Sequence, residues 1–350
     1  MKILLIQLRQ IGDVLMTTPA IRALKQNNPD SYLSFVTESP SDQVLRLNPY
    51  LDELLLFDKR WGVGEGWGFI QKLRRGQYDA AIDFHGNPRS AFLCWMSGAK
   101  TRIGFNHRGR HLAYHHKVRP SDRPSYSAAD KLRLIEPLGV SGGTLALDFP
   151  ISDQERDYAQ KLLEGMGVMP DDLLVSISPV SRQPYKVWPS GYFAQVADWL
   201  VEDFRAKILF LWGPGEQYFV EAVRSKMRNP ALPDYEVPML GQTSALLEKA
   251  WLHVGNDNGP RHFAIAVNTP TVAVFGRPRV VSWTPPDSGK HLALEHDPGC
   301  KSQCRFPDCG LECLHGVSVA AVKSEILRQL KIFSGNESDA GNKGSAGASA

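Results

Sequence analysis

The residue best suited to chemistry in the first part of the chain is Asp13. Residues 3–6 form an apolar run that predicts a buried strand, and Val14 to Leu24 carry apolar residues at helical spacing. Ligands of open α/β sheets gather at the carboxyl ends of the strands, where Asp13 is expected, so this carboxylate could face a ligand-binding cleft. A carboxylate in a first helical turn is also stabilised by the helix dipole alone. The local pattern leaves both interpretations open.

Pro19 leaves two arrangements of the helix beside Asp13. Either a single helix starts near Asp13 and kinks at Pro19, or Thr17 or Thr18 caps a second helix with Pro19 in its first turn. Both arrangements keep Asp13 in or beside the turn that follows the first strand.

Two loops in the second half of the chain carry groups suited to a nucleotide. Residues 178–189 (SPVSRQPYKVWP) follow a predicted strand and contain Ser181 and Lys186. A lysine close to a helix start can supply a point charge to a diphosphate, while backbone N–H groups supply the remaining contacts. Residues 212–216 (WGPGE) close the next strand, and Glu216 could accept hydrogen bonds from ribose hydroxyls. A tight strand-to-helix turn would explain the same glycines.

A third loop, GNDNGPRH at 255–262, has the strongest local pattern. Asp257, Asn258 and Gly259 form a turn after a strand, and His262 follows one helical turn later. Backbone N–H groups in such a turn, together with a helix N-terminus, form an anion site. Asp257 could instead only cap the helix. The stretch matches neither the Rossmann G-x-G-x-x-G nor the Walker A pattern.

Four of the five cysteines form a cluster near the end of the chain. They read C-x3-C-x4-C-x3-C and comprise Cys300, Cys304, Cys309 and Cys313. Zinc accepts four sulfur ligands, but the usual CxxC spacing is missing. A structural metal, a redox or disulfide role, and free thiols that pack an irregular loop therefore remain open. None of these readings is catalytic.

The order of the predicted elements indicates an α/β protein with two doubly wound parallel sheets facing across a cleft. We expect domains at 1–165 and 166–333, and a disordered tail at 334–350, which is rich in Gly, Ser and Ala.

Residues 61–68, rich in Gly and Trp, are expected to form a loop lining a cleft. Residues 100–124 show little periodicity. Ser152 and Glu155 predict a capping box at the start of a helix.

Charge is unevenly spread along the chain. The net charge is +3, yet residues 60–123 hold 12 Lys and Arg against 4 Asp and Glu, or +8, and the remainder is −5. A basic segment predicts an anionic partner such as phosphate, lipid or nucleic acid, although an ordinary solvated surface would explain the same charges. Nucleic acid is disfavoured because the segment lacks interleaved aromatics for stacking. The first ten residues do not read as a secretory signal, and no apolar run reaches a membrane span, so we expect a cytoplasmic protein.

Three of these motifs together resemble glycosyltransferase family 9, the lipopolysaccharide heptosyltransferases. They are LRQIGDVLMTTPAIRALK at the start, KVWP at 186–189, and VGNDNGPRHFAIAVNTPTVAVFG at 254–276. The first motif and LRLNPYLDELLLFDK look most similar to the heptosyltransferase III type, which adds a branch heptose. The resemblance runs from Met1 to about Leu330. It implies a GT-B fold with the acceptor on the first Rossmann-like domain and the donor on the second.

The resemblance also implies a reaction and a set of site residues. The donor would be ADP-L-glycero-D-manno-heptose, the acceptor the inner core of lipopolysaccharide, and the transfer inverting and independent of any metal or other cofactor. Asp13 matches the family's proposed base and Lys186 the lysine at the donor phosphates. The donor-binding positions would be Gly12, Ser181, Glu216, Asp257, Asn258, Gly259 and His262, although other members commonly have Thr or Ser at Asn258. The basic segment would bind the anionic acceptor through Arg60, Arg89, Arg102, Arg108 and Arg110.

Three alternatives stay open at this point. The chain could transfer another sugar or use another acceptor, it could be a nucleotide-sugar epimerase, or it could be a non-catalytic sugar-nucleotide-binding or lipopolysaccharide-binding subunit. An epimerase would leave the basic segment without a purpose, and a silent subunit would not need both Asp13 and Lys186. A lipid acceptor would place the protein peripherally at the inner leaflet of the inner membrane.

Overall fold

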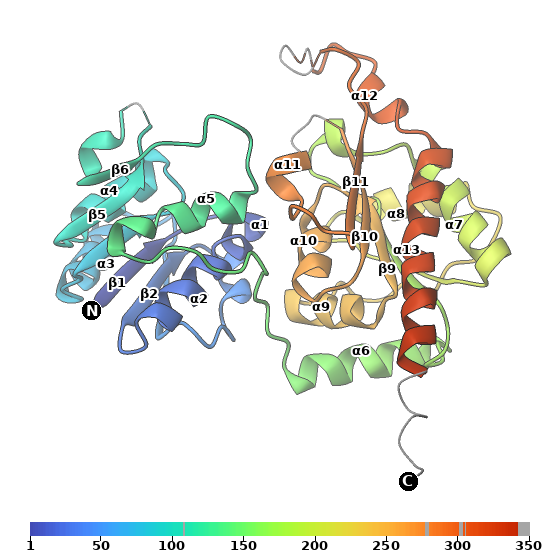
Figure 1. Ribbon diagram of the computed structural model, residues 1–350, viewed down its shortest axis with the longest axis horizontal. Helices are drawn as coiled ribbons and strands as arrows, with labels where there is room; N and C mark the ends of the chain where they lie inside the picture. The colour runs from blue at the N-terminus through green and yellow to red at the C-terminus, as the bar shows by residue number, and fades with distance from the viewer. Residues whose placement is uncertain (108, 277–279, 301–303, 305, 342–350) are drawn as a thin grey trace, which may run out of the picture. The chain divides into compact units, whose positions relative to one another are not determined.

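The computed structural model describes the chain except for residues 108, 277–279, 301–303, 305 and 342–350. Its residues form two compact units. The first consists mainly of Met1–Arg156, and the second consists mainly of residues from Asp157 onwards. Each unit is built on one parallel β-sheet with helices, as expected from the sequence, so the chain has an α/β fold (Figure 1).

The first unit holds a six-stranded parallel sheet in the order β3-β2-β1-β4-β5-β6. Its central strand β1 is buried from Ile3 to Ile6 because parallel sheets are covered on both faces. The strands are β1 Lys2–Ile6, β2 Tyr32–Thr37, β3 Glu53–Leu56, β4 Ala80–Asp83, β5 Thr101–Phe105 and β6 His116–Val118. The helices are α1 Ile11–Leu15, α2 Thr18–Asn27, α3 Val63–Arg75, α4 Pro88–Met96 and α5 Ser127–Arg133, with 3-10 turns η1 Ser41–Val44, η2 His111–Ala113 and η3 Glu136–Leu138.

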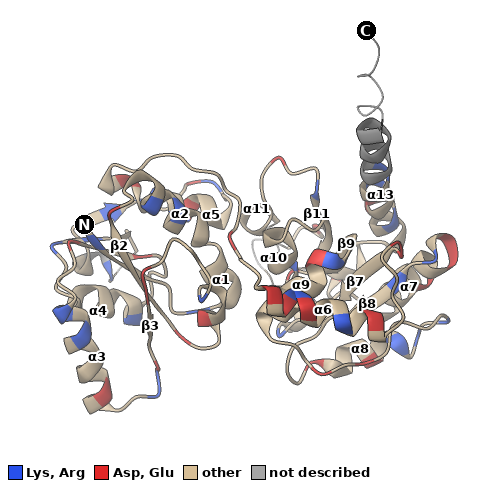
Figure 2. Ribbon diagram, turned by 90° about the horizontal axis from the view of Figure 1, so that it is seen from below, with Lys and Arg blue, Asp and Glu red and all other residues tan. Residues whose placement is uncertain are grey.

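The prediction of a loop at residues 61–68 is wrong, because most of this stretch belongs to helix α3. The helix packs through Phe69, Ile70 and Leu73 in its second half, and burial of these side chains offsets the low helix propensity of its glycines. The glycines of its first half face open space, so no apolar periodicity marks them. Figure 2 shows an acidic position near the start of α3 and Lys and Arg toward its end.

The second unit contains a five-stranded parallel sheet in the order β11-β10-β9-β7-β8. Trp188 and Phe193 are fully buried in its core against Val175 and Val254 of the central strands. The strands are β7 Leu174–Ser178, β8 Lys207–Phe210, β9 Leu252–Asn256, β10 Thr271–Phe275 and β11 His291–Glu295. The remaining helices of the chain are α6 Asp153–Gly165, α7 Ser190–Phe204, α8 Gln217–Arg224, α9 Leu240–Lys249, α10 Gly259–Ala266, α11 Val280–Trp283, α12 Glu312–His315 and α13 Val319–Gly341, with the 3-10 turn η4 Pro184–Lys186.

Helix α6 starts with the predicted capping box. Glu155 Oε2 accepts the Ser152 N–H at 2.7 Å, and Ser152 Oγ accepts the Glu155 N–H at 3.3 Å. The first unit ends within the opening turn of this helix, whereas the domain limit proposed from the sequence, residue 165, lies at its other end.

At the far end of the chain, helix α13 continues to Gly341. The expected tail began at residue 334, and its last part, 342–350, lies outside the described residues. Within the part of the chain that the structure describes, no helix is both long and apolar enough to span a bilayer.

Candidate functional site

The turn that carries Asp13 follows the carboxyl end of β1. Asp13 lies in the first turn of α1, and its Oδ2 accepts the Gln10 N–H at 3.2 Å. Helix α2 starts separately, with Thr17 at its N-cap and Pro19 in its first turn, so the second of the two predicted arrangements is confirmed. Asp13 is partly exposed to solvent. A carboxylate held by its own turn and open to solvent can still accept a proton from a bound molecule.

A buried lysine lies behind this turn. Lys131 of α5 donates from Nζ to Gln7 Oε1 at 3.1 Å and to the Phe84 carbonyl, and these two residues directly follow β1 and β4. Burial lowers the pKa of Lys131, while the nearby charges of Asp13 and Asp83 act in the opposite direction. The lysine therefore ties the carboxyl ends of the two central strands together beside Asp13.

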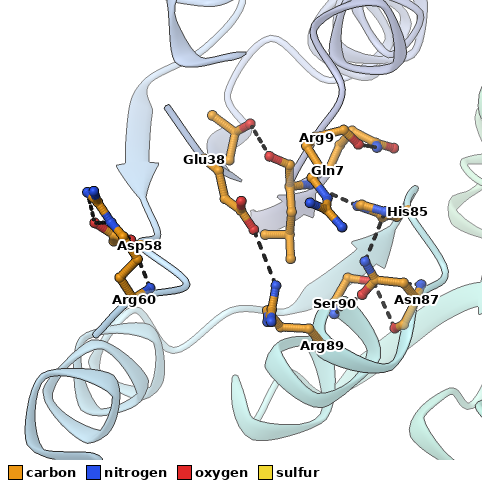
Figure 3. Close-up of polar contacts among 11 residues, drawn as sticks. Gln7, Arg9, Glu38, Asp58, Arg60, His85, Asn87, Arg89 and Ser90 are labelled. Atoms are coloured by element: carbon orange, nitrogen blue, oxygen red, sulfur yellow. Dashed lines mark hydrogen bonds and ion pairs between the residues drawn. The ribbon is translucent and has the colours of Figure 1, made fainter. Parts of the chain in front are cut away.

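His85 lies at the same edge. The Leu8 N–H donates to His85 Nδ1 at 3.2 Å, and His85 Nε2 lies 2.9 Å from Asn87 Nδ2 (Figure 3). Burial lowers the pKa of His85 to about 4, and the charges of Lys131, Arg9 and Arg89 add to this effect. A positive charge on this ring is disfavoured at neutral pH.

Two of the predicted acceptor-binding arginines are paired at the carboxyl edge of the first sheet. Arg89, in the first turn of α4, lies 3.7 Å from the Glu38 carboxylate, which is nearly buried after β2 (Figure 3). Arg60 pairs with Asp58 of its own loop at 2.6 Å and lowers the pKa of that carboxyl to about 2. The Arg89 side chain is 44% exposed and the Arg60 side chain 82% exposed.

The other three predicted arginines differ in their surroundings. The Arg102 guanidinium donates to the Ala113 carbonyl at 2.7 Å and to the Ala99 carbonyl at 3.2 Å, so it joins β5 to η2. Arg110 lines a groove beside α4. Arg108 lies outside the described residues.

In the second unit, Lys186 and Asp257 form an ion pair. Lys186 Nζ lies 2.5 Å from Asp257 Oδ2, and the two side chains are 27% and 6% exposed. Asp257 Oδ1 lies 4.0 Å from His262 Nε2, and burial lowers the pKa of that histidine to about 4. The pair lies at the carboxyl ends of β7 and β9 and directly before α10, whose N-terminus favours negative charge. This arrangement suits a bound phosphate.

Asn258 acts as the N-cap of α10. Its Oδ1 accepts the Arg261 N–H at 3.2 Å, while its Nδ2 donates to Ser178 Oγ and to the Val180 carbonyl, each at 3.0 Å. The side chain therefore connects the loop after β7 to the start of α10. Thr or Ser could cap the helix but could not donate from an amide.

Asn256, which the sequence analysis did not select, holds the lysine loop from the other side. It is fully buried, and its Oδ1 accepts the Trp188 N–H at 3.0 Å. Because this bond fixes the chain two residues after Lys186, Asn256 positions the loop rather than a ligand. It is the last residue of β9, and a polar residue that ends a buried strand is the signal that marks it.

The remaining donor-binding candidates are placed as follows. Ser181 is buried and its Oγ accepts the Gln183 N–H at 3.2 Å. Glu216 Oε2 accepts the Gly213 N–H at 3.0 Å, and its carboxylate lies 3.8 Å from Arg182. Gly259 begins α10, and a Cβ there would meet open space. Gly12 lies within α1 in the first unit.

Some residues of the first unit that were not predicted from the sequence also lie at or just after the end of a strand. Glu38 and Gln7 each directly follow a strand, as His85 nearly does, and all three lie at the carboxyl edge of the first sheet. Their position after apolar runs was the available signal. No local sequence pattern marks Lys131, because its partners Gln7 and Phe84 are 124 and 47 residues away in the chain.

The structure does not support a metal at the cysteine cluster. All five cysteines are free thiols, and the described residues contain no group of three or more His, Cys, Asp or Glu arranged to hold an ion. Burial and the proximity of Cys300 and Cys309 raise the pKa of Cys313. The described residues therefore lend no support to the structural metal that the sequence left open at this cluster.

Buried histidines in the second unit predict loss of stability in acid. Burial lowers the pKa of His253 and His291 to about 3 and that of His262 to about 4, against 6.5 in the unfolded chain. The unfolded state therefore binds more protons below pH 6.5, so stability is full above that pH and falls toward pH 4. The slope could reach roughly 4 kcal/mol per pH unit.

Denaturant unfolding followed between pH 8 and about pH 5 measures this slope. The variant His116→Gln, at an exposed position on β6, should show the same profile as the parent. A free energy of unfolding that stays constant from pH 7 to about pH 5 would show that these rings are not neutral in the folded protein.

The two parallel α/β sheets with their helices make up a GT-B fold, which the chain shares with a solved family 9 glycosyl transferase. A family model described as glycosyltransferase family 9 (heptosyltransferase) matches residues 67–309. The chain therefore belongs to glycosyltransferase family 9 and is a glycosyltransferase.

Individual relatives agree with this assignment. Lipopolysaccharide heptosyltransferase 3 of Escherichia coli K12 is 28% identical over 79% of this chain and 83% of that protein. The crystal structure of a family 9 glycosyl transferase from Veillonella parvula superposes with a TM-score of 0.81 at 26% identity, covering 94% of this chain and 97% of that one. E. coli heptosyltransferase WaaC, solved with ADP-2-deoxy-2-fluoro heptose, shares the fold with a TM-score of 0.69 at 21% identity, covering 93% and 99%.

Proposed function

We propose that this protein transfers heptose from ADP-L-glycero-D-manno-heptose to the inner core of lipopolysaccharide, with inversion at the anomeric carbon and without a metal. The observation that carries the proposal is the Lys186–Asp257 pair before the N-terminus of α10, in a chain of this family. The similarity to lipopolysaccharide heptosyltransferase 3 supports the acceptor class, and the ligand of WaaC supports the donor.

In this reaction an acceptor hydroxyl attacks the anomeric carbon as the bond to ADP breaks. The hydroxyl is a weak nucleophile, and Asp13 takes its proton as the new glycosidic bond forms. Attack from the face opposite to the leaving group inverts the configuration. The products are ADP and the glycosylated core, and the proton leaves Asp13 to solvent.

The leaving ADP gains negative charge on its β-phosphate. Lys186 supplies a cation, and the N-terminus of α10 supplies backbone N–H groups and the positive end of its dipole. Asp257 orients the lysine, and Asn256 and Asn258 fix the two loops that meet there. Ser181, Gly259, His262 and Glu216 are proposed to complete the donor site, together with Gly12. These groups can neutralise the leaving group without a divalent cation.

The basic residues of the first unit are proposed to bind the phosphates and carboxylates of the acceptor. Among the described arginines, Arg89 starts a helix at the carboxyl edge of the sheet, whereas Arg60 is paired within its own loop. We expect Arg89→Gln to raise the acceptor KM about tenfold, the value of one charge-assisted hydrogen bond, and Arg60→Gln to have a smaller effect. Initial rates at varied acceptor concentration measure the acceptor KM of both variants. Equal increases in KM would show that Arg89 and Arg60 do not differ in acceptor binding.

A donor panel tests the proposed reaction. Purified protein would be given a truncated core lipopolysaccharide with ADP-heptose, its D-glycero-D-manno epimer, ADP-glucose or UDP-glucose, and the anomeric configuration of the product would be read by NMR. The proposal predicts turnover with ADP-heptose and an inverted product. Turnover with another donor only would assign a different sugar, and a retained configuration would refute Asp13 as a base in a single displacement.

A lipid-borne acceptor also implies a location. We propose that the protein works in the cytoplasm, peripherally at the inner leaflet of the inner membrane.

A further inference from the structure

Helix α4 is apolar on its outer side as well as on its inner side. Seven of its nine residues are apolar, and Leu93 and Cys94 already face the core. Phe92 and Trp95 point outward and are 47% and 54% exposed, with ring centroids 6.3 Å apart. A surface helix normally presents a polar outer face, so this apolar face indicates a surface made for contact.

The exposed face of α4 forms one wall of a groove of about 530 Å³. The groove is lined by Pro88, Ala91, Phe92 and Trp95 of α4, and on its second wall by Gly109, Arg110, Leu112 and Ala113. Leu112 is 80% exposed, the second most exposed of the large apolar side chains in the described chain after Val63. Phe92, Trp95 and Leu112 thus form one apolar surface, here called the α4 groove, with a cation at its edge.

The charge around the α4 groove selects its partner. Residues 63–119, which surround it in the sequence, hold ten Lys and Arg against three Asp and Glu. Of the three acids, Asp83 is fully buried and Asp79 pairs with Lys100 at 2.8 Å. Three of the ten cations lie in the last turn of helix α3, which packs against α4 and carries the exposed Trp67. Exposed aromatics with surrounding cations match the interface of an anionic bilayer, where Trp rings and basic side chains both bind.

We propose that the α4 groove docks the protein onto an anionic lipid bilayer. Phe92, Trp95 and Leu112 enter the interfacial layer, and Arg110 and its basic neighbours meet the lipid phosphates. The inference rests on the proposed function in one respect, since it assumes that the acceptor is held in such a bilayer. Arg89 begins the same helix, so docking through α4 also brings the proposed acceptor-binding end of the first unit to the lipid surface.

Vesicle binding tests the docking surface separately from catalysis. The full-length protein would be floated with vesicles of phosphatidylcholine alone or mixed with phosphatidylglycerol, at low and high salt. We expect binding to the mixed vesicles that weakens with salt. The triple variant Phe92→Ser, Trp95→Ser and Leu112→Ser should partition at least about tenfold more weakly. The variant Met169→Ser and Tyr218→Ser, at exposed apolar positions of the second unit, should bind like the parent.

The controls separate the two proposals. The triple variant changes exposed side chains, so its unfolding temperature and its transfer to a delipidated core oligosaccharide should match the parent. Vesicle binding that is unchanged in the triple variant, or absent in the parent, would overturn the docking surface while transfer continues. A dimer on gel filtration that the triple variant dissociates would assign the groove to self-association and would also overturn it. Loss of transfer with every acceptor, with vesicle binding intact, would instead contradict the proposed function.

Discussion

The variant Asp13→Asn should lose about 10³-fold in kcat, because general base catalysis typically contributes 10²–10⁴-fold. The amide oxygen of Asn can still accept the Gln10 N–H that Asp13 Oδ2 accepts at 3.2 Å, so α1 should keep its start. Affinity for ADP should not change, because Lys186 and α10, which we propose to hold the diphosphate, are left intact. Initial rates of ADP release and calorimetry with ADP measure the two quantities.

Asp30→Asn is a matched control for this variant. It makes the same chemical change at an exposed position of the first unit and should keep the parental rate. If Asp13→Asn keeps a rate within a few-fold of the parent, Asp13 is a helix-start residue only and another group removes the proton.

Removal of the Lys186 charge should have the second largest effect. Lys186→Met is expected to lower kcat/KM by roughly 10²–10³-fold, the usual cost of losing one group that stabilises a developing anion. The ADP Kd should rise as well, since the cation would bind the diphosphate in the ground state too. Lys186→Arg keeps the charge but alters its geometry. Its kcat/KM should therefore fall between those of the parent and Lys186→Met.

Lys186→Met should also change the stability of the protein, because Asp257 is only 6% exposed and would lose its partner in the ion pair. Its unpaired carboxylate should lower the free energy of unfolding by about 1–3 kcal/mol. The double variant Lys186→Met with Asp257→Asn should recover stability without recovering activity. Lys226→Met, which removes an exposed lysine that donates to Ser190 Oγ, serves as the control. Activity that returns in the double variant would show that the lysine only neutralises Asp257.

The strands could be predicted well where they are buried on both faces. Residues 3–6 and 272–275 are continuous apolar runs, because helices cover both sides of a parallel sheet. Strands β5, β6 and β11 were missed. Edge strand β6 is only three residues long and largely exposed, so no apolar pattern marks it. Helix α3 was missed because its glycines hide its periodicity, and only tertiary packing makes it stable.

The candidate site was predictable in outline and not in its contacts. Lys186 and Asp257 follow strands of the second sheet, and the carboxyl edge of a parallel sheet brings such residues together. Asp13 follows a strand of the first sheet in the same way. The Lys186–Asp257 pair spans 71 residues, so no local pattern shows it. Asn258 was expected to contact the donor. In the structure it caps α10 and also joins two loops. The role of each residue in the reaction stays a proposal until it is measured.

Mass spectrometry of the acceptor tests the central claim most directly. A truncated inner-core lipopolysaccharide would be incubated with ADP-heptose and the purified protein, and its mass compared before and after. We expect an increase of one heptose residue with the parent protein and none with Asp13→Asn. An acceptor of unchanged mass, with ADP-heptose bound but not consumed, would contradict heptose transfer to the lipopolysaccharide core.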